Sequence, residues 1–190
     1  MKKHYLLLWG LILLCLSASS GSAQKMFLKA DNLTNGGSND RDFDDYVEIT
    51  SLQHGLEAET VFGPGGGPGV GRPIPKSLII TKNADLLSTK IMEKIVLGEH
   101  FTSIEIVSTV ADRITGRSLV RYKVELKNAF VTDVSTSSVH GCASDCPGVA
   151  ESVKLVFKAI RITTYSVDSK GVPKANPPFM FDVEKGTLSF

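Results

Sequence analysis

Residues 120–136 read VRYKVELKNAFVTDVST, and this stretch decides the fold. Apolar side chains occupy its even positions from Val120 to Val134 except at Asn128 and Thr132, whereas most of its odd positions are charged. A period of two places the two sets on opposite faces of a β-strand. Residues 152–165 read SVKLVFKAIRITTY and begin with the same alternation. The two runs predict a long antiparallel hairpin, and the rest of the chain must cover its apolar face.

The second run changes phase along its length. Its apolar side chains move from odd to even positions, in the order Val153, Leu155, Phe157, Ile160 and Ile162. An extra residue in one strand of a pair turns the later side chains to the other face. We therefore expect a β-bulge near Lys158–Ala159, which would help to curve the sheet.

The first 23 residues have the pattern of a secretory signal peptide. A basic start is followed by an uncharged apolar run, residues 5–16, and then by small residues that end at Ala23. The run is too short to span a bilayer comfortably, so we expect cleavage after Ala23 rather than a retained anchor, which is the alternative. The mature chain would be Gln24–Phe190, exported to the periplasm or the extracellular space.

The composition and length of the mature chain indicate one domain that does not bind nucleic acid or an anionic membrane through its charge. The whole chain has 21 Lys and Arg against 20 Asp and Glu, and removal of Lys2 and Lys3 leaves a net charge of about −1. Such a balance provides no electrostatic surface for nucleic acid or for an anionic membrane. The length of residues 24–190 suits a single domain with one core.

Shorter patterns complete the predicted set of elements. The range 83–97 predicts a helix, with Asn83 as its N-cap, a stripe of Leu87, Ile91 and Ile95, and Gly98 at its C-terminal end. The phase of residues 46–59 changes near Gly55, and residues 166–178 predict a polar loop. Further strands are predicted at residues 25–30, 46–59, 76–81, 102–110 (with Ile104, Ile106 and Val110 inward) and 179–183. About seven amphipathic strands and one helix require two layers or a closed barrel.

Residues 62–75 read FGPGGGPGVGRPIP, a composition that excludes a helix or a central strand. The segment lacks the Gly-Lys-Ser/Thr end of a phosphate-binding loop, and its prolines remove amide donors. We interpret it as an extended arm that is either flexible or ordered by a partner.

Two cysteines, Cys142 and Cys146, lie in a turn-rich segment between the two hairpin strands. In an exported protein such a close pair favours a disulfide, whereas His140, Asp145 and the two thiolates would make a cramped metal site, the less favoured alternative. Asp40, Asp42 and Asp44 have part of a calcium-loop spacing but lack the glycine at its sixth position, so a solvated acidic loop is the simpler interpretation. No poised catalytic group is visible, and we expect neither an enzyme nor a cofactor.

The order of these segments resembles the haemolysin-coregulated protein (Hcp) family, the tube subunit of type VI secretion. The resemblance covers essentially the whole mature chain and is carried by an ordered set of segments: residues 26–29, 48–56 (EITSLQHGL), 78–82 with Asp85, 124–136 (VELKNAFVTDVST) and 151–157 (ESVKLVF). Family members acting in the secretion machine normally carry no signal peptide, so this chain resembles an exported variant.

The resemblance implies a mainly β fold, a compact β-barrel of two antiparallel sheets with one α-helix packed at its side. It implies a non-enzymatic subunit that forms six-membered rings, stacks them into a hollow tube, and works with type VI secretion components or small effector cargo. An exported binding module with this fold, acting as a monomer or a single ring, is the alternative. The arm would then contact the next ring through Phe62, Gly63, Pro64, Gly65, Gly66, Gly67, Pro68, Gly69, Val70, Gly71, Arg72 and Pro73.

Overall fold

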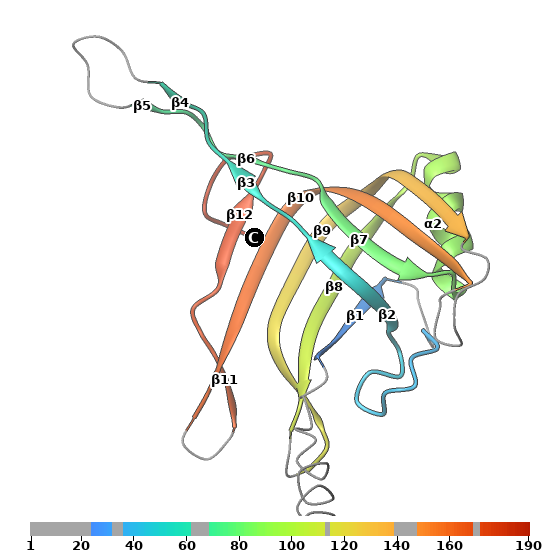
Figure 1. Cartoon of the computed structure of the whole chain (residues 1–190). Helices are drawn as coiled ribbons and strands as arrows, with labels where there is room; N and C mark the ends of the chain where they lie inside the picture. Colours follow the sequence, from blue (N-terminus) through green and yellow to red (C-terminus); the bar gives the residue numbers. More distant parts are fainter. Residues whose placement is uncertain (1–23, 32–35, 62–68, 113–114, 139–147, 169–171) are drawn as a thin grey trace, which may run out of the picture.

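The computed structural model describes residues 24–31, 36–61, 69–112, 115–138, 148–168 and 172–190. Six strands form one closed antiparallel barrel (Figure 1). In spatial order they are β10 (Val149–Val167), β7 (Leu78–Asn83), β2 (Val47–Gln53), β1 (Gln24–Ala30), β8 (His100–Ala111) and β9 (Ser118–Ser138), which pairs again with β10. The predicted barrel and its long hairpin are confirmed. The two expected sheets are continuous, because β10 pairs with β7 along one edge and with β9 along the other.

Two short strands extend the sheet beyond the barrel. The closing strand β12 (Phe179–Asp182) pairs with β10 as expected. The expectation of a polar loop over residues 166–178 is wrong in part, because β10 runs to Val167 and β11 (Pro173–Ala175) pairs with it. Three residues that include a proline carry no alternation, so the sequence pattern could not reveal β11.

The barrel interior is filled by the inward side chains of all six strands, and helix α2 (Leu86–Leu97) packs at its side (Figure 1). Leu87 and Ile91 of α2 join this core. The helix begins later than predicted, since Asn83 ends β7 and Asp85 is the N-cap. The Asp85 carboxylate accepts from the Leu87 amide at 2.8 Å, and the Ser88 hydroxyl accepts from the Asp85 amide at 3.0 Å. Gly98, with φ 65°, caps the C-terminal end as predicted.

A second, smaller apolar cluster lies on the outside of the barrel. Phe27 and Leu28 are neighbours on β1 and are both buried, because Leu28 faces the interior while Phe27 joins Phe43 and Val107 outside. The rings of Phe27 and Phe43 are stacked with centroids 4.6 Å apart. The loop before β2 therefore covers the outer face of β1 and β8. On β8, Val110 keeps the phase of the inward Ile104 and Ile106 in its pairing with β1, as expected, and is half-buried near the end of the strand.

The register irregularities differ in place from those predicted. Pairing of β10 with β9 keeps one register from Leu155 to Thr164, although the pairs skip Lys158. The bulge predicted near Lys158–Ala159 is therefore wrong, and the register shift lies between Lys154 and Leu155. Buried side chains still change face near Ala159, and β9 there contains Asn128 with a φ of 48°. Asparagine tolerates this left-handed conformation better than most residues do. In β2 a register shift lies between Ile49 and Ser51. Near Gly55, where the phase change indicated a bulge or a bend, β2 has ended at Gln53 and the next strand pairing begins at Leu56.

Candidate functional site

The described part of the arm is a two-stranded ribbon that projects from one end of the barrel (Figure 1). Near the barrel, β3 (Leu56–Glu57) pairs with β6 (Ile74–Pro75), and farther out β4 (Thr60–Val61) pairs with β5 (Gly69–Val70). The Gly71 amide donates to the Glu59 carbonyl at 2.7 Å between these pairs. Of the twelve predicted arm residues, Gly69–Pro73 are described, and Phe62–Pro68 lie outside the described residues. The sequence did not reveal the pairing, because glycine and proline carry no alternation.

This ribbon carries apolar side chains that the barrel leaves uncovered. Val70 is 70% exposed and Ile74 is 66% exposed, and more than half of Leu56 is also exposed. An isolated two-stranded ribbon is marginally stable in water unless it packs on something else. The described arm therefore leaves apolar side chains exposed to solvent in the single chain.

Arg72 fixes the ribbon to the turn that follows β12. Its guanidinium Nη2 donates to the carbonyls of Val183 at 3.0 Å and Glu184 at 3.3 Å. Gly186 lies directly beneath it, and a Cβ added there would lie 2.5 Å from Arg72 Nη2. Gly186 also has a φ of 66°, which favours glycine. The C-terminal turn and Arg72 thus set the direction in which the arm leaves the barrel.

The hydrogen bonds from Arg72 to the turn after β12 act as a latch for the arm. Substitution of Gly186 by alanine is expected to break them. The left-handed backbone alone costs about 1–2 kcal/mol for a residue with a Cβ, and the new methyl group must displace the Arg72 guanidinium. We expect faster hydrogen exchange at the Gly71 amide and a lower urea midpoint. Gly148→Ala is the matched control, since a Cβ at Gly148 meets nothing within 4 Å. Equal exchange at Gly71 in both variants would contradict the latch.

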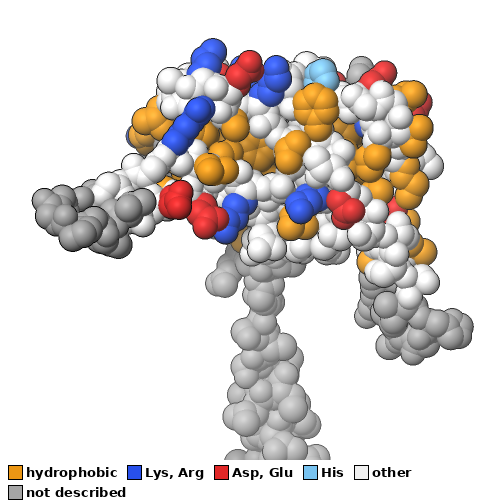
Figure 2. All heavy atoms as spheres, turned by 90° about the horizontal axis from the view of Figure 1, so that it is seen from above, with side chains coloured by type: hydrophobic (Ala, Val, Ile, Leu, Met, Phe, Trp, Pro, Cys, Tyr) orange, Lys and Arg blue, Asp and Glu red, His pale blue; other side chains and the backbone are white. Residues whose placement is uncertain are grey.

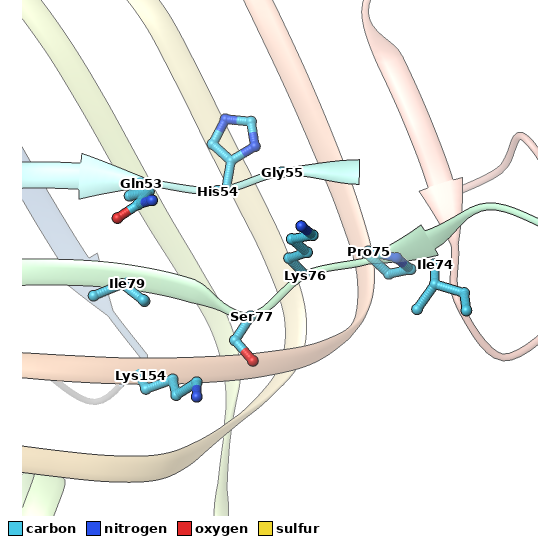
Figure 3. A pocket seen from close by; sticks show the side chains of 9 residues that line it. All are labelled: Gln53, His54, Gly55, Ile74, Pro75, Lys76, Ser77, Ile79 and Lys154. Carbon is cyan, nitrogen blue, oxygen red and sulfur yellow. The ribbon is translucent and has the colours of Figure 1, made fainter. Parts of the chain in front are cut away.

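A groove of about 480 Å³ lies at the root of the arm, between the barrel rim and β6 (Figure 3). The groove is lined by basic, polar and apolar residues: Gln53, His54, Gly55, Ile74, Pro75, Lys76, Ser77, Ile79 and Lys154. A smaller apolar cavity of about 140 Å³ shares His54 with the groove and continues toward Phe157 and Phe179. The Lys76 ammonium lies 2.8 Å from the Glu57 carboxylate across the ribbon.

His54 joins the root of the arm to the opposite side of the barrel. Its Nε2 hydrogen-bonds to the Tyr122 hydroxyl at 2.6 Å, and the two rings are nearly parallel with centroids 6.2 Å apart. Burial lowers the pKa of His54 below its ordinary value of 6.5 and raises the pKa of Tyr122. His54 is therefore neutral in the folded protein at pH 7.

The lowered pKa of His54 predicts a loss of stability in mild acid. The unfolded chain binds a proton near pH 6.5 while the folded chain resists it, so the free energy of unfolding falls as pH drops below about 6.5 and levels off below the folded pKa. His54→Gln should reduce the difference in unfolding free energy between pH 7.5 and pH 5.5, measured in urea. His100→Gln, on an exposed histidine, is the control. An unchanged pH dependence in His54→Gln would contradict the assignment.

Neither of the possible metal sites gains support from the described residues. Asp42 contacts Arg117 at 2.9 Å, which lowers the pKa of that carboxyl, and Asp40 accepts from the Ser118 hydroxyl at 2.9 Å. In the described ranges, no three His, Cys, Asp or Glu side chains are grouped as metal ligands. The predicted disulfide partners Cys142 and Cys146 lie outside the described residues, as do His140 and Asp145.

A buried ionic network behind α2 was not predicted. The Lys82 ammonium is fully buried and lies 2.8 Å from both the Glu151 and the Asp85 carboxylates and 2.9 Å from the Ser88 hydroxyl. Ser88 in turn donates to Glu151 at 2.7 Å. The sequence contains one signal for this network: Lys82 has the same phase as Leu78 and Ile80, which places it on the inward face of β7. The network fixes α2 to β7 and β10.

The comparisons with known proteins agree on one family. The family model described as "Type VI secretion system effector, Hcp" matches residues 27–164. No curated protein sequence matches the chain at a significant level. Within the described part of the chain, no helix has the length and hydropathy needed to cross a lipid bilayer.

Solved structures share the fold at low sequence identity. A type six secretion system protein superposes with a TM-score of 0.75 at 18% identity, covering 87% of this chain and 99% of its own. Hcp1 from Salmonella typhimurium superposes with a TM-score of 0.66 at 20% identity, covering 86% of this chain and 97% of its own. Hcp1 from E. coli superposes with a TM-score of 0.61 at 18% identity, covering 82% of this chain and 98% of its own. Since the family model matches well over half of the sequence, the chain belongs to the Hcp family of type VI secretion.

Proposed function

We propose that the mature chain, Gln24–Phe190, is a non-enzymatic structural subunit that assembles with copies of itself into six-membered rings, which stack into a hollow tube. The observation that carries this proposal is the projecting ribbon, whose exposed Val70 and Ile74 need a partner surface. The latch at Arg72 supports it, because a contact element must point in a defined direction. The predicted arm residues Phe62–Pro73 form the stacking contact, and type VI secretion components or small effectors are the further partners.

Assembly of the mature chain tests this function. Light scattering and electron microscopy of Gln24–Phe190 should find rings with six times the subunit mass and stacks of such rings at higher concentration. The double variant Val70→Asp/Ile74→Asp should remove stacking while leaving the circular-dichroism spectrum unchanged. Val172→Asp, a change at an exposed apolar residue on another loop, is the matched control. A chain that stays monomeric at high concentration would contradict the proposal and favour the binding module.

The groove of about 480 Å³ at the arm root is the observation that favours this second function, an exported binding module. Lys76 and Lys154 line it together with His54, so an anionic group on a partner protein is the ligand chemistry that fits. The tube subunit should form stacks of rings at higher concentration, whereas the binding module should remain a monomer or a single ring, so light scattering over a range of concentrations distinguishes the two functions.

We further propose export with cleavage after Ala23 and a Cys142–Cys146 disulfide formed outside the cytoplasm. The closed loop is short, so the bond contributes about 2 kcal/mol or less and mainly stiffens the hairpin tip. The intact mass of the secreted protein tests both points, since it should correspond to residues 24–190 less two hydrogen atoms. Two free thiols in that species would contradict the disulfide, and a retained Met1–Ala23 segment would contradict the cleavage.

A further inference from the structure

The aromatic ring of Phe190 contacts two cations on the outer face of the barrel. The Lys127 ammonium is 4.3 Å from the ring centroid, and the guanidinium carbon of Arg161 is 4.1 Å from it. Each cation follows a core residue in its strand, Lys127 on β9 and Arg161 on β10, so both side chains point outward. A cation this close to an aromatic face is attracted to it electrostatically. Phe190 is therefore attached to two strands of the barrel at once.

This contact differs from the usual pairing of charges on the surface of the protein. On the face seen in Figure 2, basic side chains lie beside acidic ones rather than in a separate basic patch. Arg161 follows that arrangement in part, because its Nη1 also lies 3.4 Å from the Glu125 carboxylate, which limits the positions that the guanidinium can take. The outer wall therefore offers the Phe190 ring a cation whose position a second contact already fixes.

A short segment joins Phe190 to the turn that holds the arm. The Thr187 carbonyl accepts from the Asp182 amide at 2.9 Å, and the Asp182 carbonyl accepts from the Gly186 amide at 2.8 Å, which closes the turn. Leu188 follows the turn and is 77% exposed. Beyond Thr187, in the part of the chain that the structure describes, the Phe190 ring ties the segment to the barrel wall.

We propose that residues 183–190 form a strap that fixes the direction of the arm, with Phe190 as its positioning residue. At its first end the strap supplies the Val183 and Glu184 carbonyls, which accept from Arg72. At its other end the contact of the ring with β9 and β10 keeps the turn in the place where it receives that guanidinium. The strap acts within one copy, so it goes beyond the proposed assembly, and an arm that is already ordered loses less entropy when it binds.

Hydrogen exchange at the Gly71 amide, which donates to the Glu59 carbonyl within the arm, tests the strap in dilute protein. Phe190→Ala should speed this exchange about fivefold or more and leave the barrel amides unchanged, since it removes both cation contacts. Phe190→Tyr keeps an aromatic face and should restore the slow exchange. Leu188→Ala is the matched control, because Leu188 is exposed two residues away. Exchange that is equally slow in Phe190→Ala and Leu188→Ala overturns the inference.

A substitution on the cation side tests the same contact. Lys127→Met keeps most of the side-chain length but not the charge, and it should speed exchange at Gly71 about two- to fivefold in the wild-type chain and not at all in a Phe190→Ala background. Lys174→Met, at an exposed lysine of β11, is the control. Equal effects of Lys127→Met in both backgrounds overturn the inference. Because exchange is measured on single copies, a chain that fails to form rings would overturn the proposed tube and leave the strap standing.

Discussion

Replacement of Lys82 by methionine is expected to lower the free energy of unfolding by about 3–5 kcal/mol, the cost of leaving a buried charge without its partner. The ammonium is fully buried and holds the Glu151 and Asp85 carboxylates, each at 2.8 Å. Methionine keeps most of the volume but leaves Glu151, itself buried, without a cation. Since Asp85 caps α2, the helix should loosen first, and urea unfolding with hydrogen exchange on α2 measures both effects.

A second substitution separates charge from packing at this site. In Lys82→Met/Glu151→Leu both buried charges are gone, and replacement of a whole buried pair by apolar residues is often close to neutral. We therefore expect the double variant to recover most of the stability lost in Lys82→Met. Lys76→Met is the control, because the Lys76–Glu57 pair is exposed on the arm and should change stability little. A Lys82→Met protein as stable as the control would show that the network is not required.

Replacement of Phe27 by alanine is expected to cost about 3–5 kcal/mol, although Phe27 points away from the barrel interior. Phe27 is fully buried against Val107 and the stacked ring of Phe43. Its removal opens a cavity beneath the loop before β2, which is then held by fewer contacts. Urea unfolding measures the loss, and faster proteolysis within residues 36–46 should accompany it.

The Phe27–Phe43 pair also predicts non-additive behaviour. Because the rings contact each other, Phe43→Ala should cost less in the Phe27→Ala background than in the wild type, with a coupling of about 0.5–1.5 kcal/mol. Phe179→Ala, at a partly exposed phenylalanine of β12, is the control and should cost much less than Phe27→Ala. Additive effects of the two substitutions would mean that the stacked pair contributes no more than its separate burial.

Periodicity predicted the elements that form the barrel, because the strands alternate between inward and outward side chains. The alternation along residues 120–136 and 152–165 corresponds to β9 and β10, and the stripe through Leu87 and Ile91 corresponds to the buried side of α2. The N-cap was placed at Asn83 instead of Asp85, because both residue types cap helices and the pattern does not say where β7 ends. The predicted bulge near Lys158–Ala159 failed because the buried face changes there without a register shift, at a point where the pairs skip Lys158 and β9 contains the left-handed Asn128.

The sequence by itself determined the class of the fold, its long hairpin, the side helix and the family resemblance, since these depend on local periodicity and on the order of segments. Only the tertiary structure decided which residues meet across the barrel. Lys82 and Glu151 are 69 residues apart, and Arg72 and the Val183 carbonyl are 111 apart. No local pattern contains such pairs, because they form only when the sheet closes. The same closure leaves Val70 and Ile74 of the arm and Val96 of α2 exposed, which no local pattern could reveal.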